Sequence, residues 1–146
     1  MRLHSLALLL LAPALTACAS RPTHEHLQLA GAKSDLPFSH AVVAGDTVHV
    51  AGTLGLDPAT GQPPAEVERE IRLMLDDVRA KLALAGLEMD DLVSVQVFCP
   101  DLSLYDTFNK IYRTYFTGAF PARSFIGSGP LLRGCRFEIN GVAVRR

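Results

Sequence analysis

The sequence contains no tryptophan, only 7% aromatic residues and none of the short motifs that mark common metal and nucleotide enzymes. It has no HExxH zinc motif, no Walker loop and no GxGxxG fingerprint. Its 14 basic and 15 acidic residues give a formal net charge of −1 and form no basic stripe. Nucleic acid is therefore not an expected partner. Any chemistry has to be sought in individual side chains.

What is present fits one globular domain. The chain has 146 residues, of which 49% are hydrophobic and 20% charged. That length is enough to bury a hydrophobic core, and the composition is not that of a disordered chain.

The first 17 residues have the anatomy of a secretory signal peptide. Arg2 precedes an apolar run over residues 6–15, which is too short to span a bilayer, and small residues follow. The sequence LTAC at 15–18 resembles the bacterial lipobox, which predicts cleavage before Cys18 and a lipid anchor on its thiol. An ordinary cleavage site with an incidental Cys18 is the alternative. Ala19 and Ser20 are not the Asp of inner-membrane retention, which favours the periplasmic side of the outer membrane.

A polar stretch separates this signal from the rest of the chain. Residues 18–35 read as a lipidated tether, and residues 36–146 as the domain. His24 and His26 have the spacing of a metal pair, but no further ligand is nearby, so we interpret them as solvated. No metal site is expected.

Hydrophobic periodicity predicts the order β-β-α-β-α-β-β. Extended runs at 38–44 and 47–54 flank a turn at Gly45, and a helix is expected over 64–85. A strand follows at 93–97, then a helix over 104–116 and extended runs at 123–128 and 136–144. This alternation indicates an α+β domain with two helices on one face of a sheet. Oligomerisation would cover the other face. Cys99 and Cys135 could pair in an oxidising compartment or stay free, and free thiols are favoured.

Several segments together resemble one family, in the correct order from about Leu36 onward. They are PFSHAV at 37–42, VAGT at 50–53 with LDPATG at 56–61, VF at 97–98 with Asp101, FN at 108–109 and Tyr112, PARS at 121–124, and FEI at 137–139 with VAV at 142–144. The family is the Rid (YjgF/YER057c/UK114) group of reactive-intermediate deaminases. The resemblance implies a chorismate-mutase-like fold on a mixed sheet, a homotrimer with ligand sites between subunits, and hydrolysis of 2-imino acids to 2-keto acids and ammonia. It implies no cofactor.

The resemblance also assigns roles to particular residues. Arg123 matches the family's carboxylate-binding Arg, and a guanidinium can hold a carboxylate through two hydrogen bonds. Glu138 matches the Glu that orients the attacking water and could act as general base. Gly52 matches a position where the backbone approaches substrate, and Asn109 matches a pocket-lining Asn.

Two positions depart from the family pattern. Phe38 stands where active members have Tyr, so a hydroxyl donor is missing. Phe125 stands where many members have Cys, so the pocket wall is expected to be reshaped. Three functional hypotheses therefore remain open. The chain is an imine deaminase in the cell envelope, a non-catalytic trimer that binds a small carboxylate or a protein, or a purely structural lipoprotein with no ligand.

Overall fold

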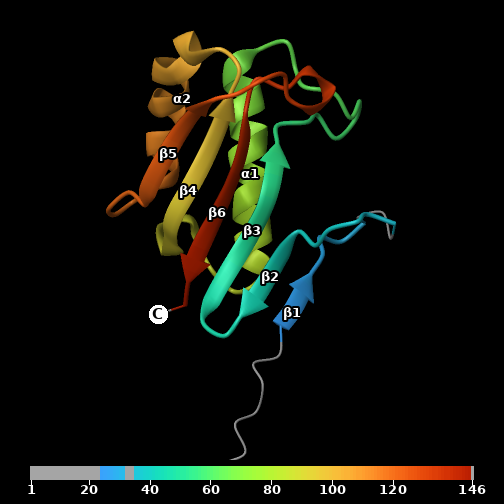
Figure 1. The fold of residues 1–146 in the computed structure, drawn as a ribbon, viewed down its shortest axis with the longest axis vertical. Coiled ribbons are helices and arrows are strands. Elements are labelled where there is room, and N and C mark those ends of the chain that lie inside the picture. The colour runs from blue at the N-terminus through green and yellow to red at the C-terminus, as the bar shows by residue number, and fades with distance from the viewer. Residues whose placement is uncertain (1–23, 32–34, 146) are drawn as a thin grey trace, which may run out of the picture.

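The computed structural model of the protein describes residues 24–31 and 35–145. Its centre is a six-stranded sheet in the order β1-β2-β3-β6-β4-β5 (Figure 1). The strands are β1 (His24–Leu27), β2 (Ala41–Ala44), β3 (Thr47–Leu54), β4 (Leu92–Cys99), β5 (Ala122–Gly127) and β6 (Glu138–Val144). The expected signal peptide and Cys18 lie outside the described residues.

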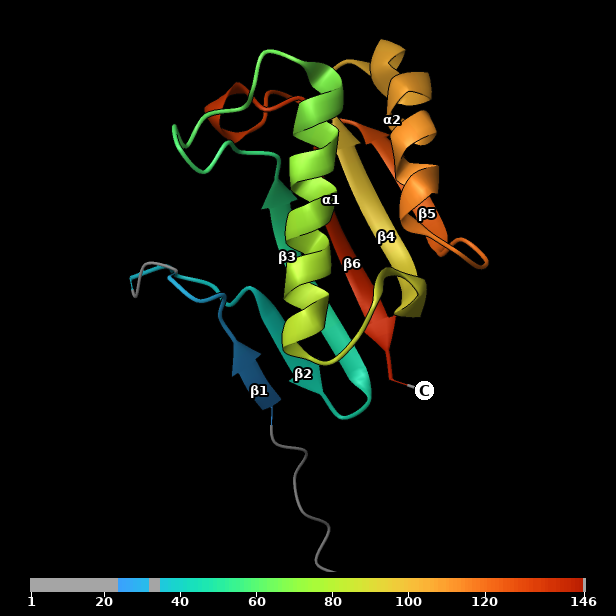
Figure 2. The same cartoon turned by 180° about the vertical axis from the view of Figure 1, so that it is seen from behind.

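Two helices cover one face of this sheet. Helix α1 (Val67–Leu84) and the shorter helix α2 (Tyr105–Tyr112) lie side by side in front of it in Figure 2. Strands β4 and β5 are parallel, whereas the other neighbouring strands are antiparallel. The predicted α+β class, with two helices on one face of a mixed sheet, is confirmed.

Strand β1 is a difference from the sequence analysis, which placed His24–Leu27 in the tether. These residues pair antiparallel with β2 at the edge of the sheet, and all but Leu27 are exposed. An exposed edge strand gains its backbone hydrogen bonds without burying an apolar face, so its sequence need not alternate. The sheet therefore begins inside the stretch that the sequence analysis assigned to the tether.

Helix α1 packs through the apolar stripe that its periodicity predicted. Ile71, Met74, Leu75, Val78 and Leu82 are each 2% exposed or less. The helix begins at Val67 rather than 64, because residue 66 is extended and the carbonyls of residues 64 and 65 accept hydrogen bonds from the guanidinium of Arg136. Gly86 follows its end with φ +73°, a conformation that glycine adopts without strain.

A buried ion pair joins α1 to the start of β6. The carboxylate of Glu70 is fully buried and accepts hydrogen bonds from the backbone N–H of Arg136 at 2.7 Å and of Phe137 at 3.3 Å. Arg136 Nε also donates to Glu70 Oε2 at 2.5 Å. A buried carboxylate with three donors is well compensated. This contact fixes the chain where it enters β6, the strand that begins with Glu138.

The other face of the sheet has no helix across it in the described part of the chain (Figure 1). Its residues are mixed in character: His49, Gln96 and Ser124 are exposed, and Glu138 and Val142 are half-buried. We refer to this surface as the open face.

Candidate active site

Arg123 lies on strand β5 and points toward helix α2. Its Nη2 donates to Asn109 Oδ1 at 2.7 Å and reaches the hydroxyl oxygen of Tyr105 at 3.5 Å. The structure therefore brings together Arg123 and Asn109, two of the residues that the sequence analysis selected. The guanidinium has five N–H donors, so donors remain for an anion.

Aromatic rings surround the Arg123 guanidinium. Its Cζ lies 4.8 Å from the ring centroid of Tyr112 and 5.7 Å from those of Tyr105, Phe108 and Phe125. Such cation–π contacts stabilise the cation and restrict its side chain. Phe125 also packs edge-on against Tyr105 and Phe108, with centroids 5.0 and 5.3 Å apart. The ring expected to reshape the pocket wall is thus one side of the aromatic enclosure of Arg123.

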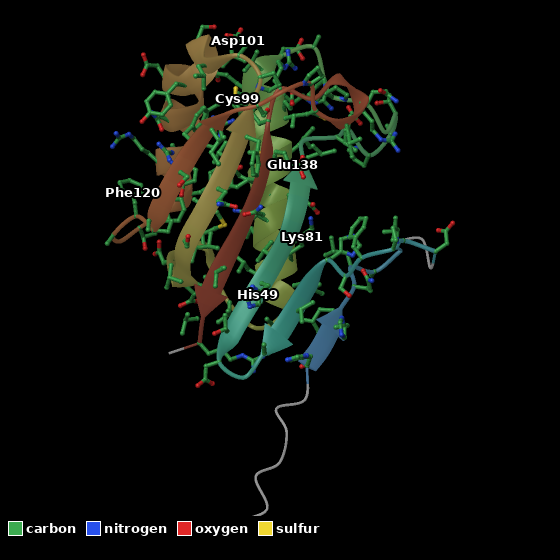
Figure 3. The ribbon with its side chains drawn as sticks, viewed as in Figure 1. His49, Lys81, Cys99, Asp101, Phe120 and Glu138 are labelled. Carbon is green, nitrogen blue, oxygen red and sulfur yellow. The ribbon has the colours of Figure 1, made fainter. Side chains whose placement is uncertain are left out.

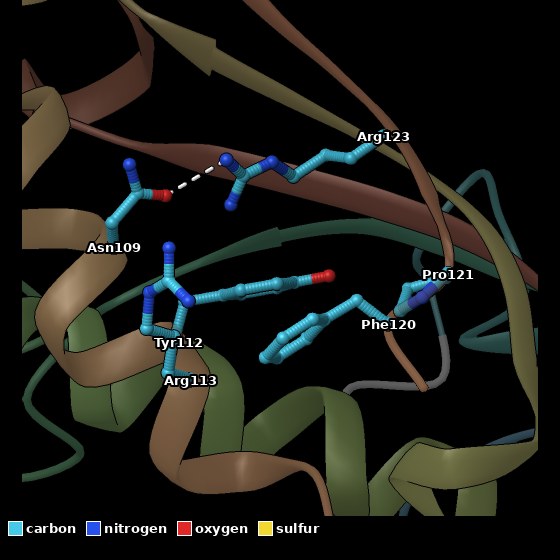
Figure 4. Close-up of a pocket in the computed structure, with 6 residues that line it drawn as sticks. All are labelled: Asn109, Tyr112, Arg113, Phe120, Pro121 and Arg123. Atoms are coloured by element: carbon cyan, nitrogen blue, oxygen red, sulfur yellow. Dashed lines mark hydrogen bonds between the residues drawn. The ribbon is translucent and has the colours of Figure 1, made fainter. Parts of the chain in front are cut away.

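A cavity of about 240 Å³ opens beside this guanidinium (Figure 4). Its lining residues are Asn109, Tyr112, Arg113, Phe120, Pro121 and Arg123. Tyr112, Arg113 and Phe120 were not among the site residues expected from the sequence, although Tyr112 belongs to the motif around Asn109. A usable signal existed for the first two, because residues three and four after Asn109 share its helical face.

The hydroxyl of Tyr112 is unusual within this cavity. It is buried and has no hydrogen-bond partner in the described part of the chain. Burial raises the pKa of Tyr112 to about 12, so the group is a protonated donor at neutral pH. By contrast, a hydrogen bond with Asn109 and the charge of Arg123 lower the pKa of Tyr105. An unsatisfied buried hydroxyl beside a cation is a position where a ligand can gain a hydrogen bond.

Glu138 does not join this group within one subunit. Strand registers pair Arg123 with Val95, and Glu138 with Phe98. Because successive strand residues point to opposite faces and Val95 is buried under the helices, Phe98 points to the open face. Glu138 therefore lies on the open face, and Arg123 lies on the helix face. Figure 3 shows the position of Glu138 on the sheet.

Gly52 instead accompanies Glu138. A Cβ atom at Gly52 would stand 2.3 Å from Glu138 Oε1, so any side chain at this position would displace the carboxylate from where it lies against the backbone of β3. The register between β3 and β6 shifts between Val50 and Thr53, which places Gly52 in a β-bulge. The structure thus brings together Gly52 and Glu138 as a second group.

A buried lysine supports this bulge from the helix side. Lys81 of α1 is 2% exposed, and its Nζ donates to Thr53 Oγ1 at 2.7 Å. The same Nζ pairs with Asp77 Oδ2 at 3.0 Å. Thr53 Oγ1 in turn donates to the carbonyl of Ala51 at 2.9 Å. Ala51 and Thr53, the two neighbours of Gly52, are therefore held by one series of hydrogen bonds that starts at Lys81. Sequence periodicity did not reveal this network.

Phe38 belongs to neither group. Its ring is 48% exposed and packs edge-on against His40, with centroids 5.9 Å apart. Cys99 and Cys135 are free and buried, and burial raises the pKa of both thiols. In the residues that the structure describes, no group of three or more His, Cys, Asp or Glu side chains is placed to hold a metal. None of the helices in that part of the chain is long and apolar enough to cross a membrane.

Comparisons with known proteins agree on one family. A sequence model of the family described as endoribonuclease L-PSP matches residues 30–145. A mouse (Mus musculus) protein named 2-iminobutanoate/2-iminopropanoate deaminase is 37% identical over 110 residues, which are 75% of this chain and 82% of that protein. A protein of the same name from Escherichia coli (strain K12) is 36% identical over 113 residues, covering 75% and 88%. The crystal structure of E. coli TdcF with bound serine matches with a TM-score of 0.72 and 31% identity, covering 83% of this chain and 94% of that one.

Proposed function

The chain belongs to the endoribonuclease L-PSP family, the Rid family of the sequence analysis, and from that premise we propose that it hydrolyses 2-imino acids to 2-keto acids and ammonia. The observation that carries the proposal is the caged guanidinium of Arg123 beside a small cavity, in a chain whose relatives are named imine deaminases. Serine bound to TdcF, a small amino carboxylate, supports a ligand of this size. RNA cleavage is not proposed, because the formal net charge is −1 and no basic stripe is present.

The reaction adds water across a C=N bond. The oxygen of water attacks C2, the imine nitrogen gains both protons of that water, and ammonia leaves while C2 keeps the oxygen as a keto group. Arg123 binds the C1 carboxylate through donors not used by Asn109, which fixes C2 relative to the attacking water. Glu138 takes the proton from water and returns it to the departing nitrogen.

This mechanism needs Arg123 and Glu138 at one substrate, although one subunit places them on opposite faces of its sheet. We therefore propose a homotrimer in which the β5 edge of one subunit, with its Arg123 cavity, meets the open face of its neighbour, so that each site lies between two subunits. One subunit would supply Arg123 and Asn109, and its neighbour Glu138 and Gly52. The half-buried apolar residues of the open face support this assembly, because a partner would remove them from water.

The direct test is imine hydrolysis by the mature domain. An amino-acid oxidase generates 2-iminopropanoate from alanine, and ammonia release is compared with the spontaneous rate. Arg123→Ala should lower kcat/KM by on the order of 100-fold, because a bidentate charged contact is lost. Lys110→Gln serves as the matched control, since Lys110 is an exposed cation of α2 paired with Glu68. No acceleration by the wild type, or full activity of Arg123→Ala, would refute the proposal.

A non-catalytic trimer that binds small carboxylates is the second candidate. Phe38 favours it, because that ring lacks the hydroxyl of active members. Calorimetry with 2-keto acids separates the two: binding that depends on Arg123, without turnover, supports the second candidate and excludes the first.

We also propose that the protein is lipidated on Cys18 and faces the periplasm, anchored to the outer membrane. The support is the order of basic start, apolar run and LTAC sequence at 1–18. Incorporation of labelled palmitate that is lost in Cys18→Ser tests the anchor, and fractionation of the envelope tests its membrane. Label retained in Cys18→Ser would contradict it.

A further inference from the structure

A second cation, Arg113, lines the same cavity as Arg123. It follows the last residue of α2, one helical turn after Asn109, and is exposed. Its Cζ lies 5.7 Å from the ring centroid of Phe120. The helix dipole favours a cation at a helix C-terminus, which explains why an arginine can stand at position 113. It does not explain why this arginine shares a cavity with a second guanidinium.

Neither of the two guanidiniums forms an ion pair within the part of the chain that the structure describes. The hydrogen bonds of Arg123 go to the neutral side chains of Asn109 and Tyr105, and the contact of Arg113 is with a ring. Two uncompensated positive charges at one small cavity repel each other and attract anions. The charge of one carboxylate would compensate only one of them.

The aromatic lining gives each cation its own place. Arg123 lies over Tyr112, and Arg113 lies over Phe120. The Tyr112 and Phe120 rings are nearly parallel, with an angle of 27° and centroids 6.3 Å apart. The two cations therefore contact different rings of the cavity lining. Figure 4 shows both side chains among the residues that line the cavity.

The size of the cavity limits what can occupy it. Its volume of about 240 Å³ lies just below the range of ~300–1,000 Å³ that is usual for drug-sized ligands. A short aliphatic chain with a carboxylate at each end fits such a space and matches its charge.

We propose that this cavity takes the imines of acidic amino acids, that is, 2-imino dicarboxylic acids. Arg123 binds the C1 carboxylate next to the reacting C=N bond, and Arg113 binds the carboxylate at the far end of the chain. The assignment of Arg123 rests on the proposed imine hydrolysis. Arg113 is then a specificity-determining residue, and the products are 2-keto dicarboxylic acids and ammonia.

The test compares two imines that differ in the second carboxylate. An oxidase specific for acidic amino acids generates 2-iminosuccinate from aspartate, and a second oxidase generates 2-iminopropanoate from alanine. For Arg113→Gln, kcat/KM for 2-iminosuccinate should fall about tenfold, mainly through KM, because one charged hydrogen-bonding partner is lost. The value for 2-iminopropanoate should change less than about twofold, since that imine has no second carboxylate to bind. Arg113→Lys should recover part of the loss, and Lys110→Gln, which removes an exposed charge from the same helix, should change neither value.

Equal effects of Arg113→Gln on both imines, or no effect on either, would overturn the proposal. A wild type that hydrolyses neither imine would refute the proposed function. In that case, binding of the stable keto acids decides whether the cavity is a dicarboxylate site. Tighter calorimetric binding of 2-oxoglutarate than of pyruvate, lost in Arg113→Gln, supports the dicarboxylate site even without turnover. Equal binding of the two acids, or binding of neither, overturns it.

Discussion

At the scale of single residues, the resemblance placed the cation correctly and left out its surroundings. Arg123 and Asn109 were expected in one pocket and are hydrogen-bonded. Tyr112 belongs to the motif around Asn109 but was given no role. Arg113 was missed because it lies outside that motif, although both residues lie one helical turn beyond Asn109. The role of Phe125 depends on ring packing around Arg123, which no spacing in the sequence encodes.

Removing the unpaired hydroxyl of Tyr112 should separate stability from ligand binding. Tyr112→Phe deletes a buried hydroxyl that has no partner among the described residues, so we expect the free energy of unfolding to stay level or rise by about 1 kcal/mol. The affinity for keto acids should fall if that hydroxyl meets the ligand. Tyr115→Phe is the control, because its hydroxyl donates to Asp76 Oδ1 at 3.0 Å and its loss should cost about 1 kcal/mol. Urea denaturation and calorimetry measure both; equal destabilisation of the two variants would contradict the expectation.

His40 should give the fold a dependence on pH. Burial, followed by the charge of Lys81, lowers the pKa of His40 below its usual 6.5, and Asp77 opposes this. The unfolded chain then binds more protons than the folded chain below pH 6.5, so the free energy of unfolding falls as the pH drops through that region. His40→Gln should flatten this slope in urea denaturation between pH 7 and pH 5, whereas His24→Gln, at an exposed edge position, should not. An unchanged slope in His40→Gln would disprove the assignment.

At the scale of elements, the parts that could be predicted are those with a buried stripe. Helix α1 and the β2–β3 hairpin bury regular apolar positions, and the sequence shows them. Strand β1 and the bulge at Gly52 are different, because pairing at an edge and a register shift come from backbone contacts. Lys81 is the clearest exception to the stripe: a lysine on the buried face of α1 needs a partner that only the tertiary structure reveals.

The pair of Lys81 and Asp77 should respond asymmetrically to substitution. Asp77→Asn leaves a buried ammonium without its carboxylate, and we expect it to lower the free energy of unfolding by about 1–2 kcal/mol, a reduced figure because Asp77 is partly exposed. Lys81→Met removes the buried charge and keeps the volume, so its effect should be under about 1 kcal/mol. The double variant should be more stable than Asp77→Asn alone.

Chemical denaturation of the single and double variants checks this order. Glu68→Gln, which breaks the exposed pair with Lys110, is the control and should change stability by less than about 0.5 kcal/mol. A double variant no more stable than Asp77→Asn would show that the charge of Lys81 is not the cause.

At the scale of the whole molecule, the fold could be predicted from the sequence. Whether one subunit holds every residue of the site could not be derived from the spacing of its residues. Ordered motifs named the family and its α+β architecture. They also suggested Arg123 and Glu138 as one catalytic pair, whereas strand register puts these residues on opposite faces of a subunit. Arg123 pairs with Val95 and Glu138 with Phe98, and these two β4 residues are an odd number of positions apart, so their side chains point to opposite faces. The sequence could not show this, because it does not say which strands pair or in which register.

A site shared between subunits predicts complementation. Arg123→Ala and Glu138→Gln should each lose nearly all activity. An equal mixture of the two, unfolded together and refolded, should regain roughly a quarter of wild-type activity, because about three quarters of the trimers are mixed and each mixed trimer has one intact site of three. Mixing the folded variants without exchange of subunits is the control and should restore nothing. Absence of recovery after co-refolding would place both residues in the same subunit's site.

Strand β1 finally bears on how far such a protein could reach from a bilayer. The sheet begins at His24. A lipid on Cys18 would therefore be joined to it by a tether of about 20 Å even at full extension, at ~3.3–3.6 Å per residue. The domain would then stay within about its own diameter of the headgroups. Three lipid tethers on one trimer would strengthen its attachment to the membrane through avidity and would restrict its tilt.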